Sequence, residues 1–401
     1  MTITLKNPYL LFQYLWILVL CPKELQFFLL LIYVILINTD DLHRLKYYPD
    51  TLFVLMLSFS VIHMFSIIIN AIFCQTEPVR IAAAFNTALI WIIAAFAYSY
   101  FKNHKVKLER ICRLSCINLL ILIGLACLSL ICFYILKNSD TSIFGIDLYG
   151  IDWFKGKPHL RFKGGMEYNN LVVILYVLLL PLAFSYLKQK SRVFSFAFLL
   201  ASFIPVILSL SRSGYLIIST AYLLVFLLCK GHKRKDYLLL AVFIVVFLGL
   251  LFMYAENIKD IMESLIFART GSNHTRMQIY FESVGLTLKN SPIWGMGIKH
   301  ISESGYPLGS HSTYIGVFYK TGIGGTFVFA GILTGILKIL LSRKENKTIR
   351  AEAIFIFMLF LEFLFEDMDG ADWVIVLLFS VIGIIGYKEN QYELQKSNEL
   401  G

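Results

Sequence analysis

The longest polar stretch of the chain, residues 256–311, lies between two hydrophobic runs and gathers side chains that could bind an anion. It gathers, among others, Arg269, His274, Arg276, Lys289, Lys299, His300 and His311. A guanidinium presents a planar fork that matches phosphate oxygens, and an ammonium acts on phosphate as a point charge. We therefore expect Arg276 and Lys299 to bind an anionic ligand.

His311 stands at the end of this stretch, where the next hydrophobic run begins. A neutral imidazole in that place can accept a proton from a hydroxyl group near physiological pH. We predict that His311 is a catalytic base, and the alternative is a structural histidine at the membrane surface. His274 and His300 are weaker candidates, because no further pattern surrounds them.

Arg212 is a second predicted anion ligand, and its place in the membrane follows from counting. It lies twenty residues after Arg192 and eighteen before Lys230, which both belong to short basic segments. At about 1.5 Å per helical residue, both distances are roughly 27–30 Å, one hydrocarbon thickness. Arg212 should therefore lie at the opposite membrane face, in a tight turn over 209–214. The alternative is an arginine that only meets lipid headgroups there.

An amphipathic helix is expected over 274–289, because apolar side chains in this segment partly follow helical spacing. Asn290-Ser-Pro292 should end the helix, and Gly295-Met-Gly297 should form a turn that allows close backbone approach. Arg276 would then stand in the first turn of the helix.

The composition requires a membrane protein. Of 401 residues, 58% are hydrophobic and 15% are charged, with a mean hydropathy of +0.72. Soluble chains carry about 25% charged residues. The apolar runs are continuous rather than alternating, which predicts an all-α polytopic fold rather than a β-barrel. The net charge of +10 is spread over short loops, so it predicts membrane topology and not nucleic-acid binding. None of the seven cysteines forms a CxxC pair, which argues against disulfides and thiolate metal sites.

We expect a single membrane domain, 1–401, with twelve spans. These lie at about 9–21, 24–38, 51–74, 78–100, 112–136, 168–187, 193–210, 213–229, 237–254, 314–341, 352–367 and 371–387. The first two are short and form either separate spans or a re-entrant pair around Pro22. Alternate connections are uniformly basic and short, which predicts that they and both termini are cytoplasmic. The two long loops, about 137–167 and 255–310, should then face outward.

The first long loop also carries a basic run at its end. Its members are Lys155, Lys157, His159, Arg161 and Lys163. One interpretation is an outward basic vestibule for an anion, to which Arg161 would contribute. The other is simple solvated surface.

Four patches, in this order over about 160–325, resemble the O-antigen polymerases and O-antigen ligases of bacterial surface-polysaccharide assembly. Residues 162–171, with Asn170, resemble the glycine-then-asparagine start of a central span, and 209–214 resemble the family's Ser-Arg-Gly turn. Residues 276–297 resemble an Arg…Pro-x-x-Gly-x-Gly stretch, and His311-Ser…Gly322 resembles a His-Asn/Ser…Gly signature.

This resemblance implies a membrane glycosyltransferase that uses an undecaprenyl-pyrophosphate-linked oligosaccharide and needs neither metal nor cofactor. The cytoplasmic (inner) membrane, its lipid and a chain-length regulator protein are the surroundings and partners it implies. Arg212 and Arg276 would bind the pyrophosphate, with Asn170, Arg161, Lys299 and Lys320 as further ligands, and His311 would activate the acceptor hydroxyl. Preorganised cations in a poorly hydrated site stabilise the charge of a departing pyrophosphate better than water does.

Two features depart from the family pattern. Lys320 stands where the family often has an acidic residue, and Glu167-Tyr168-Asn169 replaces a more usual Asn-Pro step. Lys320 either adds a positive charge for phosphate or only extends to the membrane surface.

Three functions stay open at this point. A polymerase joins lipid-linked repeat units, a ligase transfers the glycan to lipid A core, and a transporter or flippase moves the lipid-linked glycan. Asp367-Met-Asp369 is a rival metal motif, for which helix capping or pairing with basic residues is the alternative.

Overall fold

A computed structural model defines the fold of this chain. It describes residues 7–44, 49–73, 77–137, 142–143, 145–154, 157–228, 270–302, 305–341, 347–368 and 371–400. The expected span at 237–254 and the first part of the expected loop 255–310, including Arg269, lie outside these residues.

The first expected span, 9–21, is divided in the structure. Two short helices, α1 (Leu10–Gln13) and α2 (Leu15–Leu20), meet at Tyr14, and α3 (Lys23–Arg44) follows Pro22. Proline fixes φ and is tolerated just before or at a helix start, so the chain resumes as a helix directly after it. The short segment expected at 9–21 is thus two helices, and the second segment is longer than expected.

Three long apolar helices come next. They are α4 (Thr51–Phe73), α5 (Pro78–Asn103) and α6 (Leu108–Leu130), and α6 continues into the π-helical turn η1 (Ile131–Ile135). Pro78 occupies the first position of α5, where its missing N–H has no intrahelical partner to lose.

Two short β-hairpins, which were not predicted, occupy the middle of the expected loop 137–167 in an otherwise helical fold. β1 (Ser142–Ile143) pairs antiparallel with β2 (Ile146–Asp147), and β3 (Tyr149–Phe154) pairs with β4 (Lys157–Phe162). Tyr149 lies opposite Phe162, and both side chains are buried in the helical core. The hairpin base is thus anchored to the bundle by apolar burial.

The central helix is α7 (Asn170–Lys190). Its apolar window is 78% buried, against 28–44% for the other long apolar helices. This confirms that 162–171 leads into a central span. Shorter apolar helices, α8 (Arg192–Leu208) and α9 (Arg212–Leu228), follow it. Ser191 caps α8 by accepting a hydrogen bond from the Phe194 amide at 3.3 Å.

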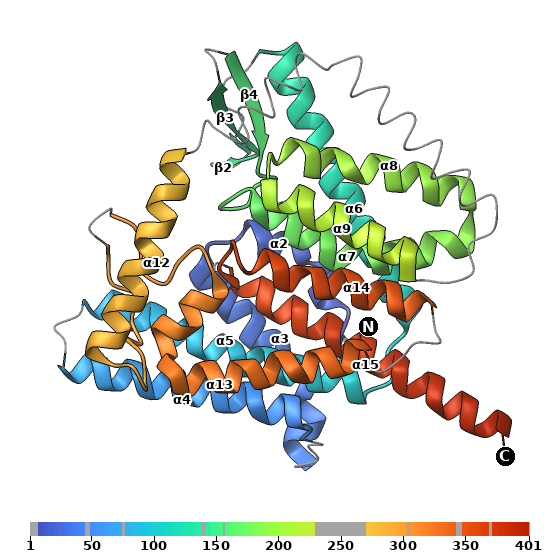
Figure 1. Cartoon of the computed structure of the whole chain (residues 1–401). Helices are drawn as coiled ribbons and strands as arrows, with labels where there is room; N and C mark the ends of the chain where they lie inside the picture. Colours follow the sequence, from blue (N-terminus) through green and yellow to red (C-terminus); the bar gives the residue numbers. More distant parts are fainter. Residues whose placement is uncertain are drawn as a thin grey trace.

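The remaining described helices are α12 (Thr270–Asn290), α13 (Thr313–Leu341), α14 (Lys347–Glu362) and α15 (Asp372–Leu400). The amphipathic helix predicted over 274–289 is confirmed as α12, which ends at Asn290. α13 has a kink at Gly322, whose φ is +60°. α9, α13, α14 and α15 run side by side, and α12 lies at one end of this group (Figure 1).

Five described helices are long and apolar enough to cross a membrane: α4, α5, α6 with η1, α7 and α13. The chain is therefore a helical membrane protein. The fifth of these, α13, agrees with the span expected at 314–341, whereas α14 ends at Glu362 and not at residue 367. Its last expected turn is instead part of the connection to α15.

The connections fall into two groups at opposite ends of the bundle. At one end the basic connections contact one another through the ion pairs Lys102–Asp50, Lys190–Glu109 and Lys388–Glu352. The α8–α9 turn, the α14–α15 turn and the segment before α13 gather at the other end. Among the residues that the structure describes, the connections expected on the two sides of the membrane thus lie at opposite ends of the bundle.

Candidate functional site

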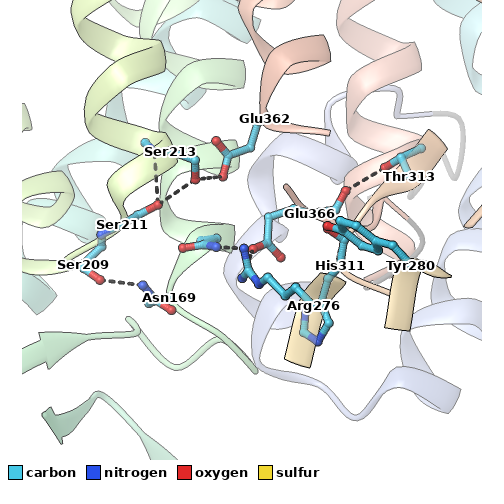
Figure 2. Close-up of polar contacts among 12 residues, drawn as sticks. Asn169, Ser209, Ser211, Ser213, Arg276, Tyr280, His311, Thr313, Glu362 and Glu366 are labelled. Atoms are coloured by element: carbon cyan, nitrogen blue, oxygen red, sulfur yellow. Dashed lines mark hydrogen bonds and ion pairs between the residues drawn. The ribbon is translucent and has the colours of Figure 1, made fainter. Parts of the chain in front are cut away.

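Glu366 joins side chains from three distant parts of the chain. It lies in the turn after α14, and one of its carboxylate oxygens, Oε1, accepts a hydrogen bond from the Asn170 amide at the start of α7. The same oxygen is 3.4 Å from Nη2 of Arg276 on α12. Figure 2 shows Arg276 and Glu366 side by side. Two predicted anion ligands, Asn170 and Arg276, therefore meet at one point.

This ion pair is buried on one side only. The Glu366 side chain is 7% exposed, whereas that of Arg276 is 31% exposed. Burial raises the pKa of Glu366 to about 7, against the opposing effects of the Arg276 charge and the Asn170 hydrogen bond. The guanidinium thus has a buried partner behind it and remains accessible from the opposite direction.

The backbone of Glu366 fixes the start of α13. Its carbonyl accepts hydrogen bonds from the Thr313 amide at 3.0 Å and from the Thr313 hydroxyl at 2.8 Å. The Thr313 hydroxyl in turn accepts from the Met368 amide at 2.8 Å. The turn after α14 consequently determines where the two residues before α13 lie.

His311 lies in that position, at the edge of the same site (Figure 2). Its φ is +64°, a left-handed conformation that is uncommon outside glycine, and the Tyr280 hydroxyl donates to its carbonyl at 2.6 Å. Burial lowers the pKa of the His311 imidazole; Arg276 and Lys299 lower it further, while Asp367 opposes them. The ring is thereby kept neutral at physiological pH, the form that a general base requires.

Asn169 connects the hairpin to the α8–α9 turn. Its side-chain oxygen accepts a hydrogen bond from Arg161 Nη2 at 2.7 Å, and its amide donates to the Ser209 carbonyl at 2.6 Å. Arg161 also lies 3.6 Å from Asp152 across the hairpin. Asn169 thus contacts the hairpin and the α8–α9 turn, whereas its neighbour Asn170 contacts Glu366. Arg161 is held beside the site by Asn169.

Arg212 is the first residue of α9 and is half-buried. The turn before it is tight, with φ +51° at Leu210. Its neighbour Ser213 donates to the buried carboxyl of Glu362 at 2.9 Å, one helical turn before Glu366. The predicted turn over 209–214 therefore lies at the same end of the bundle as Arg276.

A second cationic group surrounds Asp367. Lys299 forms an ion pair with this carboxylate, and Lys320 is 2% exposed on α13. Burial disfavours ionisation of Asp367, but the charges of Lys299 and Lys320 outweigh it and lower its pKa. The pairing of this acidic turn with basic residues is thus confirmed for Asp367. Lys320 faces the protein interior and not the membrane surface.

The segment after α12 rests on a polar face of α4. His63, Ser66 and Asn70 follow helical spacing, and they donate to the carbonyls of 297, 294 and 295. The Asn70–Gly295 bond is 3.0 Å and the His63–Gly297 bond is 3.2 Å. Side chains of a membrane helix thereby satisfy backbone carbonyls of this segment.

Glycines make this close approach possible. Gly295 and Gly297 have positive φ values, +77° and +64°. A Cβ on Gly297 would come within 2.6 Å of the Ser66 backbone, and one on Gly295 within 2.4 Å of the Gly322 amide. The Gly-x-Gly turn predicted at 295–297 is confirmed, and it packs against the kink of α13.

The acidic motif at Asp367 pairs with protein groups. Asp367 contacts Lys299, and Asp372 accepts a hydrogen bond from Asn86 at 3.0 Å. Asp369 lies outside the described residues. Among the residues that the structure describes, no group of three or more His, Cys, Asp and Glu side chains is arranged to hold a metal ion.

Several residues of the site were not predicted from the sequence, chiefly Glu366, Asn169, Tyr280 and the polar face of α4. The sequence does contain a signal for Glu366, because an acidic residue in or beside a membrane span is a candidate functional residue. For His63, Ser66 and Asn70 the signal is their helical spacing. It does not indicate what they contact.

Comparison with protein families gives one match. Residues 196–330 match the model of the family described as O-antigen ligase. The matched segment contains Arg212, Arg276, Lys299, His311 and Lys320. A search of curated proteins gives no match.

Proposed function

We propose that this membrane protein, which carries an O-antigen ligase family domain, joins polyprenyl-pyrophosphate-linked repeat units of a surface polysaccharide. The observation that carries the proposal is the meeting of Arg276, Asn170 and Glu366 beside His311 (Figure 2). The site thus combines donors suited to a phosphate with a neutral imidazole suited to a hydroxyl.

In this mechanism the acceptor hydroxyl attacks the anomeric carbon of the donor glycan. The bond between that carbon and the phosphate oxygen breaks, and a new glycosidic bond forms. His311 takes the hydroxyl proton, and the polyprenyl pyrophosphate leaves with the bonding electron pair. Arg276, with Arg212, Arg161 and Asn170 around it, would stabilise the charge that develops on the leaving group.

Lys299 and Lys320 form the second cationic group of the proposal. Lys320 is buried, so it would act on a ligand through Asp367 and Lys299 and not by direct contact. The adjacent acids Glu366 and Asp367 each hold a cation from a different segment. Two separate cationic groups favour a polymerase, because its donor and its acceptor both carry a pyrophosphate.

The charge pattern supports an orientation for this site. The opposite end of the bundle carries the short basic connections, which are retained on the cytoplasmic side of membranes. We therefore place the site at the outer face of the cytoplasmic membrane, with both termini inside. The donor would then be a lipid-linked glycan already moved across the bilayer.

A ligase is the second candidate, and the description of the matched family favours it. A ligase and a polymerase share the donor and differ in the acceptor. Deleting the gene separates them: surface glycan with a single repeat unit indicates a lost polymerase. Loss of all attached glycan, with lipid-linked polymer accumulating, indicates a lost ligase.

Complementation of the deletion strain tests the site itself. We expect Arg276→Ala and His311→Ala, expressed at wild-type level, to leave surface polysaccharide uncorrected. Lys289→Ala is the matched control, because it removes a positive charge from an exposed position at the end of the same helix. If both site variants restore glycan length and amount as well as Lys289→Ala does, the proposed mechanism is wrong.

A further inference from the structure

We infer that, before the donor binds, the Glu366 carboxylate occupies the position of the donor pyrophosphate. The pyrophosphate then replaces the carboxylate at Arg276 and Asn170. The inference rests on the proposed function. It makes Glu366 a positioning residue that holds the anion-binding groups before the donor binds and competes for them when the product leaves.

The convergence of two donors on one oxygen carries this inference. Oε1 of Glu366 accepts from the Asn170 amide and lies 3.4 Å from the Arg276 guanidinium. A bound phosphate would present the same thing, an oxygen that accepts hydrogen bonds from an amide and from a guanidinium. Arg276 and Asn170 thus already point at the position of an anion, and the Glu366 carboxylate takes that position.

The unequal burial of the pair shows how the exchange is possible. Glu366 is 7% exposed and Arg276 is 31% exposed, so a ligand can first reach the guanidinium from its open side and then displace the carboxylate from it. Arg276 stands near the beginning of α12, which lies at the edge of the helical group (Figure 1). A donor can therefore approach without separating the central helices.

The backbone of Glu366 stays in place during such an exchange. Its amide donates to the Glu362 carbonyl at 3.0 Å, and its own carbonyl accepts two hydrogen bonds from Thr313. Only the side chain has to rotate, and the start of α13 keeps its position. His311 is consequently held in the same place whether or not the donor is bound.

The carboxylate has two effects on the cycle. It offsets the cost of a half-buried arginine when no donor is present, because an unpaired buried charge is strongly destabilising. It also competes with the leaving polyprenyl pyrophosphate for the guanidinium, which shortens the time that the product stays bound. A neutral residue at 366 would bind the product more tightly and release it more slowly.

The experiment measures binding of undecaprenyl pyrophosphate to the purified full-length protein in detergent, with undecaprenol as the uncharged reference. We expect Glu366→Gln, which keeps the shape and an amide oxygen, to bind undecaprenyl pyrophosphate about three- to tenfold more tightly than the wild type. In vesicles, KM for the donor should fall because the competitor is removed, and kcat should fall because the product leaves more slowly. Glu282→Gln, which removes an acid from α12 outside the site, should change neither.

Equal or weaker binding by Glu366→Gln, together with weakened binding by Arg276→Ala, would overturn the inference and leave the proposed function standing. A wild-type protein that does not distinguish undecaprenyl pyrophosphate from undecaprenol would overturn both. Glu366→Asp is the second variant if the glutamine protein is not monodisperse. Its shorter side chain withdraws the carboxylate from Arg276, so tighter binding is expected again, and wild-type affinity or weaker would contradict the inference.

Discussion

The Tyr280 hydroxyl donates a hydrogen bond of 2.6 Å to the backbone carbonyl of His311. This bond links α12, which carries Arg276, to the segment that carries the proposed base. It fixes a residue with left-handed backbone geometry and connects that residue to the helix that carries Arg276.

Tyr280→Phe should lower turnover about three- to tenfold without preventing folding. The lost hydrogen bond is worth about 1 kcal/mol, and the freed His311 backbone would spend less time in the reactive position. The measurement is the initial rate of glycan transfer in vesicles. Phe281→Leu, at an exposed position of the same helix, is the control. An unchanged rate for Tyr280→Phe would show that α12 does not position the base.

The pH dependence of transfer should reflect the lowered pKa of His311. The base must be neutral to accept a proton, and a lowered pKa keeps it neutral to more acidic pH than a free imidazole. We therefore expect the rate to be retained as the pH falls to about 6.5 and to be lost only below it. His311→Ala should reduce the rate by about 10²- to 10⁴-fold and remove this acidic limb. A limb that persists in His311→Ala belongs to another group.

Asn170→Asp should weaken donor binding far more than its small change in shape suggests. The new carboxylate replaces the amide donor directly against Glu366, and two carboxylates in contact repel each other and any phosphate. We expect KM for the lipid-linked donor to rise by about tenfold or more, with partial recovery at lower pH, where one carboxyl is protonated. Asn103→Asp, at the opposite end of the bundle, is the matched control. A donor KM equal to that of the control would separate Asn170 from donor binding.

Gly297→Ala should destabilise the protein, because its Cβ would lie within 2.6 Å of the Ser66 backbone and its φ is positive. We expect a loss of about 2–5 kcal/mol from overpacking and backbone strain. Gly285→Ala is the opposite case. Its Cβ has nothing within 4 Å and lies inside α12, so alanine should stabilise the helix by about 1 kcal/mol. Thermal unfolding in detergent compares the two, and equal melting temperatures would contradict the packing described for this segment.

Continuous apolar runs and basic connections were sufficient to predict a helical membrane protein, α12, the turn at 295–297 and the common end of the bundle at which 170, 212, 276 and 311 lie. These features depend on local composition and on helix length, which a sequence displays directly. The β-hairpins at 142–162 were not predicted, although Tyr149, Ile151 and Trp153 alternate with Gly150 and Asp152 as the residues of a strand do.

Glu366 shows what local patterns leave undetermined. Its partners are 196 and 90 positions away along the chain, at Asn170 and Arg276. Spacing along one helix cannot specify such contacts, since they depend on how three segments meet. The Asp-x-Asp spacing at Asp367 is typical of a metal motif, whereas the neighbouring residue, Glu366, makes the contacts that organise the site.

The polar face of α4 lies more than a hundred residues before the segment that matches the O-antigen ligase family. His63, Ser66 and Asn70 nevertheless satisfy three carbonyls inside that segment. Asn170 and Glu366, on either side of it, complete the arrangement around Arg276. The matched segment is therefore not a transferable module. A chimera that placed residues 196–330 in another polytopic protein would leave those carbonyls without these hydrogen-bond donors, at a cost of about 1–3 kcal/mol for each one that stays buried. Exchanging specificity between such proteins requires α4, the start of α7 and the α14–α15 turn to move together.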